Sequence, residues 1–151
     1  MGREINSCHD LRVWQEGMRL VTDVYELARR LPNEEKFGII PQMCRAAVSV
    51  PANIAEGHGS SHRKVFLNHL SITRGSLMEL ETYLLLIVQL QFLEPQNTQA
   101  IHQRIQTVGK LTSALIRALK RRSSPSPKTE PHRQQPESGT QTPRPSRHLI
   151  S

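Results

Sequence analysis

Apolar side chains recur at helical spacing along most of the chain, and no stretch of useful length alternates as a β-strand would. Breaks at Pro32, at residues 57–61 and at Glu94-Pro95 divide this pattern into four segments. Four amphipathic segments joined by short breaks predict an all-α fold, an antiparallel up-down four-helix bundle over residues 10–122. A flexible N-terminus over residues 1–9 would precede it.

The first segment predicts a helix from an Asp10 N-cap to about Leu31. Its apolar positions form two adjacent stripes that cover roughly half of the circumference. A helix at the rim of a monomeric bundle needs a narrower apolar surface, so we expect part of this one to face another subunit. The stripes are Leu11, Trp14, Met18, Val21, Tyr25 and Ala28, and beside them Val13, Leu20, Val24, Leu27 and Leu31. On the polar face the i,i+4 spacing predicts the ion pairs Arg12–Glu16, Arg19–Asp23 and Glu26–Arg30.

The second predicted helix begins at residue 33 or 34 and runs to about Glu56. Pro51 lies deep inside its pattern, where a proline removes a backbone hydrogen bond and costs about 3 kcal/mol unless the helix bends. We therefore expect a kink, with Ser49 or a neighbouring chain bonding the freed carbonyl near Ala47.

The residues after the kink predict a local hydrogen-bond set and a corner. Asn53 and Glu56 are polar side chains in an otherwise small, apolar turn, which favours a structural role. Gly57 suits a left-handed C-cap, and Ser60 or Ser61 suits the next N-cap.

The third and fourth segments predict two longer helices. The third runs to about Phe92 or Leu93, and small residues on it would let another backbone approach closely: Ser71, Gly75 and Ser76. The fourth begins at Pro95, which fits a first helical turn, and continues to about Arg122.

The segment after Arg122 has a different composition. Residues 123–151 hold six of the ten prolines and are otherwise mostly Ser, Thr, Gln, Arg and His. Such a segment cannot bury enough apolar surface to offset an ordering entropy of roughly 1–2 kcal/mol per residue. We therefore expect a disordered basic tail.

Positive charge is concentrated in the last predicted helix. The formal net charge is +7, and residues 1–122 carry 16 Lys and Arg against 11 Asp and Glu. No acidic residue occurs between Glu94 and Glu130, so the outer face of the fourth helix is wholly positive. This face and the start of the third helix are candidate nucleic-acid contacts, through Arg63, Lys64, Lys110, Arg117, Lys120, Arg121 and Arg122. The alternative is a solvated surface whose charge only confers solubility.

No motif for catalysis or for cofactor binding is present, and we expect neither enzymatic activity nor a cofactor. His58, His62 and His69 lack nearby Cys or carboxylate partners in sequence, so a metal site is not expected. A hydrolase that depends on Glu56 or Glu79 is the remaining catalytic alternative.

The two cysteines, Cys8 and Cys44, and the lack of an apolar secretory segment suggest a reduced cytoplasmic protein. The longest apolar run, Tyr83–Val88, is too short to cross a membrane.

Three stretches resemble a known family. They are DLRVWQEGMRLVTDVYELARRLP, RAAVSVPANIAEGHG and FLNHLSITRGSLMELETYL, and they are similar to the bacterial 23S ribosomal RNA intervening-sequence proteins. The resemblance covers residues 10–122 and implies a left-handed up-down bundle that assembles as a homopentamer with a basic surface. In fold and charge the chain is also similar to the accessory variability protein of diversity-generating retroelements, which implies nucleic acid and a reverse transcriptase as partners.

These patterns together predict a non-catalytic, homo-oligomeric scaffold that binds structured RNA through basic helix surfaces. The partner would be a ribosomal RNA insert or a retroelement reverse-transcriptase complex. The alternative is a protein-interaction scaffold with no nucleic-acid partner.

Overall fold

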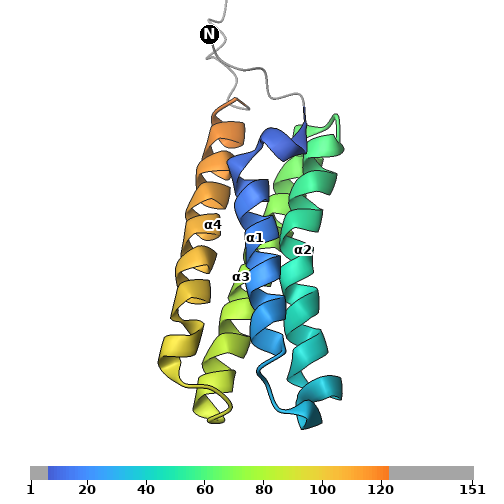
Figure 1. Cartoon of the computed structure of the whole chain (residues 1–151). Helices are drawn as coiled ribbons and strands as arrows, with labels where there is room; N and C mark the ends of the chain where they lie inside the picture. Colours follow the sequence, from blue (N-terminus) through green and yellow to red (C-terminus); the bar gives the residue numbers. More distant parts are fainter. Residues whose placement is uncertain (1–6, 123–151) are drawn as a thin grey trace, which may run out of the picture.

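The computed structural model describes residues 7–122 and contains four long α-helices in up-down order (Figure 1). The predicted tail at residues 123–151, and most of the predicted flexible N-terminus, lie outside the described residues. The described part contains no strand, which confirms the all-α four-helix prediction. The helices are α1 (Arg12–Ala28), α2 (Ile39–Gly59), α3 (Arg63–Gln89) and α4 (Pro95–Arg121), with 3-10 turns η1 (Cys8–Asp10) and η2 (Asn33–Phe37) before α1 and α2.

The four helices form a closed ring of neighbours. α1 packs on α2 and α4, and α3 packs on the same two helices from the other side. The tightest pair is α2 with α3, and α4 lies less closely against both of its neighbours. Because the helices alternate in direction, α1 and α3 begin at the end of the bundle where α2 and α4 finish (Figure 1).

The two predicted apolar stripes of α1 differ in burial. One of its two predicted stripes, from Val13 to Leu31, is fully buried. The other lies at the edge of the core, and on it Met18 is 45% exposed and Tyr25 46% exposed. The buried hydrophobic core residues of the other helices are Met43, Ala46, Ala47, Val50, Ile54, Leu70, Leu77, Leu80, Leu84, Ile87, Ile101, Ile105, Val108 and Ile116.

Helix boundaries differ from the prediction where backbone geometry intervenes. Asp10 is not the N-cap of α1, because it belongs to η1, and Leu11 precedes the helix without a side-chain cap. α1 ends at Ala28 and not at Leu31. The second helix is split, since Gly38 with φ −102° and ψ −111° separates η2 from α2.

The third helix also ends earlier than predicted. α3 stops at Gln89, and Gln91, with φ 61°, adopts a left-handed conformation that turns the chain toward α4. α4 begins at Pro95 as predicted, and its N-cap Glu94 forms a capping box with Asn97.

A polar network joins α2 to α3 next to Pro51, and α2 continues as a helix through this buried proline. Asn53 Nδ2 donates to the Ser49 carbonyl at 2.8 Å and to Ser49 Oγ at 2.9 Å, so Asn53 forms the expected local hydrogen bonds. Ser49 Oγ lies 2.8 Å from Ser76 Oγ, and His69 Nδ1 lies 2.9 Å from Asn53 Oδ1. Since the amide nitrogen of Asn53 is used on Ser49, its oxygen accepts, and His69 donates through Nδ1.

Glu56 remains outside this network. Its side chain is 72% exposed, and its carboxylate lies 3.9 Å from His69 Nε2.

Gly57 is not a left-handed C-cap, which corrects the prediction. The described glycines all have negative φ, and α2 continues to Gly59 before Ser60 adopts an extended conformation. Gly57 is buried against α3, where an added Cβ would lie 2.7 Å from Phe66 Cδ2 and 2.8 Å from His69 Cβ. The position therefore requires glycine for close helix packing.

Replacing Gly57→Ala should lower the free energy of unfolding by about 1–3 kcal/mol, because the methyl group overlaps α3. Gly59→Ala is the matched control, since a Cβ there meets nothing within 4 Å. It should be neutral or stabilising by up to about 1 kcal/mol. Urea denaturation followed by circular dichroism measures both, and equal stability of the two variants would contradict the packing role of Gly57.

Candidate nucleic-acid interface

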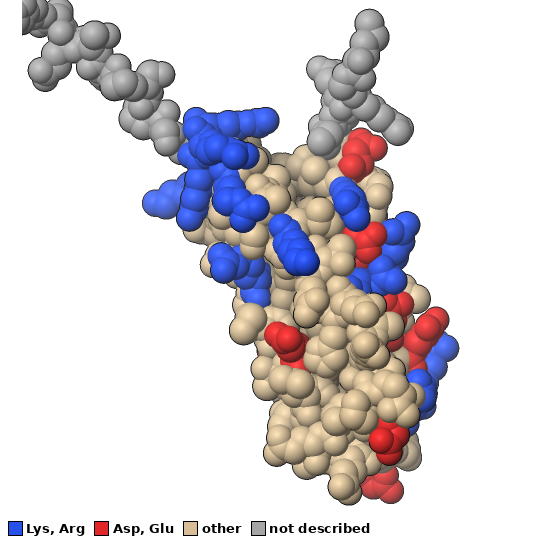
Figure 2. Space-filling model, turned by 90° about the vertical axis from the view of Figure 1, so that its left-hand side faces the viewer, with Lys and Arg blue, Asp and Glu red and all other residues tan. Residues whose placement is uncertain are grey.

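Lys and Arg gather at the end of the bundle where α4 finishes and α3 begins (Figure 2). The lower half of the same face carries few charges (Figure 2). The structure therefore brings the sequence-predicted cations of two helices to one region, which we call the cationic end. It consists of the exposed side chains Arg63, Lys64, Lys110, Arg117, Lys120, Arg121 and Arg122.

On α4 the cations follow the helical period. Lys110, Arg117 and Arg121 are spaced by seven and four residues and so share one side of the helix, with Lys120 and Arg122 on its flanks. None of these five, nor Lys64 on α3, forms an ion pair within residues 7–122. Their positive charge is therefore not neutralised by the folded part of the chain.

The start of α3 carries cations where a helix usually prefers anions. Its first turn contains Arg63 and Lys64 and no acidic residue, and its N-cap His62 makes no side-chain capping bond. Because the positive end of the helix dipole lies there, two cations raise the local potential further. An anion bound at this end would be stabilised by both the dipole and the side chains.

A groove with a volume of about 450 Å³ separates α3 from α4 beside the cationic end, and we call it the α3–α4 groove. Ser71, Gly75 and Arg74 line it from α3, and Gly109 and Ser113 line it from α4. Lys110 and Arg117 border its continuation toward the end of α4. Ser76, which was grouped with Ser71 and Gly75 in the sequence, instead faces α2.

Arg74 lines the α3–α4 groove but was not among the cations predicted from the sequence. It lies in the middle of a long helix, away from the other cations in sequence. The signal was available in the spacing, because Arg74 follows Arg63 by eleven residues, about three helical turns.

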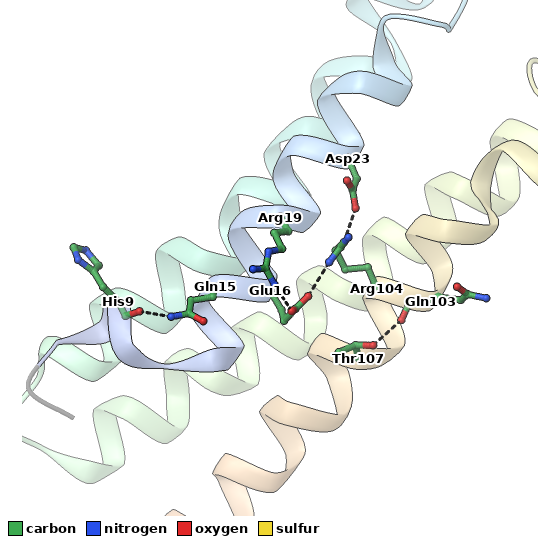
Figure 3. A network of polar contacts seen from close by, with 8 residues as sticks. All are labelled: His9, Gln15, Glu16, Arg19, Asp23, Gln103, Arg104 and Thr107. Carbon is green, nitrogen blue, oxygen red and sulfur yellow. Dashed lines mark hydrogen bonds and ion pairs between the residues drawn. The ribbon is translucent and has the colours of Figure 1, made fainter. Parts of the chain in front are cut away.

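Arg104 is the cation of α4 that the fold does neutralise (Figure 3). Its Nη1 donates to Glu16 Oε2 at 2.8 Å, and its Nε donates to Asp23. Glu16 is buried and also accepts from Arg19 Nη1 at 2.6 Å. The hydrogen bond to Asp23 is the main cause that raises the pKa of Arg104.

This network corrects the ion pairs predicted for α1. Glu16 pairs with Arg19 and Arg104 and not with Arg12, and Asp23 pairs with Arg104 and not with Arg19. The error arose because spacing within one helix says nothing about an arginine that approaches from another helix.

Two of the three histidines considered as metal ligands, His58 and His69, contact neighbouring side chains. The ring of His58 meets the edge of Phe66 with centroids 5.9 Å apart, and His69 bonds Asn53. Within residues 7–122, no group of three His, Cys, Asp or Glu side chains is arranged to hold a metal ion. None of the described helices is long and apolar enough to cross a membrane.

The fold and its charges define an up-down helical bundle with one cationic end and a groove beside it. The family model of the 23S rRNA-intervening sequence proteins matches residues 9–114, and the chain belongs to this family. It is also similar to the 1.70 Å crystal structure of a protein of unknown function from the S23 ribosomal protein family of Bacteroides thetaiotaomicron VPI-5482. The two share 26% sequence identity with a TM-score of 0.65, covering 69% of this chain and 97% of the other. The comparison with curated proteins finds no match.

Arg104→Ala should lower the free energy of unfolding by about 2–3 kcal/mol, because it removes one of the two partners of the buried Glu16 carboxylate and also the partner of Asp23. The exposed Arg29, which forms no ion pair within the described part of α1, supplies the control Arg29→Ala, expected within about 0.5 kcal/mol of the parent. A double-mutant cycle with Glu16→Gln should show coupling. Additive losses would contradict the network.

Proposed function

We propose that this protein is a non-catalytic scaffold that binds structured RNA by its phosphate backbone through the cationic end. The observation that carries the proposal is that no carboxylate of residues 7–122 neutralises six exposed side chains of this end, which are Lys64, Lys110, Arg117, Lys120, Arg121 and Arg122. Arg104 provides the contrast within the same helix, because there the fold supplies two carboxylates.

A solvated basic surface explains part of this distribution but not all of it. Lys120 and Arg121 lie in the last turn of α4, where cations stabilise a helix without any ligand. Arg63 and Lys64 lie in the first turn of α3, where they oppose the helix dipole. A bound phosphate would reverse this unfavourable term, so the α3 cations favour an anionic ligand over simple solubility.

The family name supports RNA as that ligand, since it links these proteins to intervening sequences of 23S rRNA. Two settings fit the proposal: a ribosomal RNA insert, or a retroelement complex with a reverse transcriptase. Genomic neighbourhood distinguishes them, because the gene would lie inside a ribosomal RNA gene in the first case and beside a reverse-transcriptase gene in the second.

Self-association is the second part of the proposal, with the homopentamer as the expected state. α1 exposes Met18 and Tyr25, and a shallow groove between α1 and α2 brings Tyr25 beside Val48, itself 42% exposed. Burying this apolar strip against another subunit would remove it from water.

Binding of a synthetic stem–loop RNA, measured by gel shift across salt, tests the first part. If each assembly neutralises six to ten phosphates, affinity should fall about a thousandfold or more between 50 and 200 mM salt. The triple variant Lys110→Gln/Arg117→Gln/Lys120→Gln should lower the slope of log affinity against log salt by about one for each phosphate contact that the assembly loses.

The control variant removes the same charge from the other end of the bundle, through Arg29→Gln, Arg30→Gln and Lys36→Gln. It should keep most of the affinity. Equal losses of affinity in both variants would contradict RNA binding by the cationic end. Binding that is absent or insensitive to salt would also contradict it, and would favour a protein-interaction scaffold.

Light scattering at micromolar concentration tests the second part. The parent protein should have a mass above that of one chain. The Met18→Lys/Tyr25→Lys variant should have a lower mass, because it places two charges in the apolar strip that would contact the other subunit. Circular dichroism should show unchanged helicity, since both side chains lie outside the buried core. A monomeric parent protein would refute self-association.

A further inference from the structure

The two glycines of the α3–α4 groove have no packing function. Among the described residues, a Cβ on Gly75 would meet nothing within 4 Å, and one on Gly109 would meet only Leu77 Cδ1 at 4.0 Å. Gly17 differs, since a Cβ there would contact Val50 and Pro51 of α2 at 3.4–3.6 Å. Glycine inside a helix costs about 0.5–1 kcal/mol relative to alanine. Gly75 and Gly109 both carry this cost and lie on opposite sides of one groove. No packing contact within the bundle offsets the cost.

We propose that the α3–α4 groove holds one strand of RNA by its phosphodiester backbone, an inference that rests on the RNA-binding function proposed above. The floor of small side chains, Ser71 and Gly75 opposite Gly109 and Ser113, lets a backbone approach both helices.

Charge gives the groove a direction. Arg74 lies on its α3 side, and Lys110 and Arg117 follow on α4 toward the cationic end. Glu81 lines the opposite end of the groove, where a phosphate would be repelled. From Lys110 to Arg121 the helix rises about 16 Å, so these cations can contact more than one phosphate of a strand.

The groove contacts the backbone and not the bases. Among the described residues, no aromatic side chain lines the groove or the adjoining hollow on α4, so bases have no stacking partner there. Binding should therefore depend little on sequence. An acidic protein segment is the other occupant that the charges allow, and competition separates the two.

The test uses the full chain and a fluorescent single-stranded oligouridylate, with affinity measured by anisotropy. Gly75→Leu/Gly109→Leu fills the groove without changing charge, and its helicity and stability should match or exceed those of the parent protein. The affinity of this variant should fall at least tenfold. Ala52→Leu/Ala100→Leu adds the same side chains at exposed positions outside the groove, and it should bind as the parent does. Oligoadenylate should bind like oligouridylate.

Three results would contradict RNA binding in the α3–α4 groove. Full affinity of the Gly75→Leu/Gly109→Leu variant, with affinity lost in the Lys110→Gln/Arg117→Gln/Lys120→Gln variant, would place RNA on the cationic end alone and leave the proposed function standing. Displacement of the oligouridylate by an equal concentration of polyglutamate would assign the groove to an acidic protein segment. If the parent protein binds no RNA, both RNA binding in the groove and the proposed function are wrong.

Discussion

The close contact between α2 and α3 determines where this bundle is tight and where it is open. Gly57 admits Phe66 and His69 of α3 to a distance that any side chain would prevent. The Ser49–Ser76 and Asn53–His69 hydrogen bonds then hold the two helices at that distance. α4 has no such close contact with α3. The space beside Gly75 of α3 and Gly109 of α4 is not filled by atoms of the described residues. α3 therefore packs closely against α2 on one side and leaves a groove beside α4 on the other.

The charges divide in the same way as the packing. α1 supplies Glu16 and Asp23 to the interface with α4, and Arg104 is the α4 residue that meets them. The other cations of α4 lie beyond this interface, and the α3 face that borders them supplies one carboxylate, Glu81, at the far end of the groove. Pairing thus stabilises the contact between α1 and α4, while the unpaired cations are left on the side that faces solvent and the groove.

The sequence predicted the fold well because helical periodicity and proline breaks are local signals. It placed the four helices, Pro95 at the start of α4 and the buried stripe of α1 correctly. It failed where partners come from another element: Glu16 was paired with Arg12 although Arg104 of α4 bonds it, and Gly57 was interpreted as a cap although α3 packs against it. The cationic residues were predicted one by one, but Arg74 and the groove required the register of α3 against α4, which no single segment encodes.

The two surfaces used by the proposals do not compete for the same part of the molecule. Met18 and Tyr25 lie on the α1–α2 side of the bundle, and the groove lies between α3 and α4 on the opposite side. Subunits related by cyclic symmetry all point the same way, so a ring built on the α1–α2 side would present every cationic end on one face. One subunit offers only a modest potential, but repeated copies on one face raise the local field and allow one RNA to contact several sites. Self-association through α1 would therefore strengthen phosphate binding without adding a single contact to any groove.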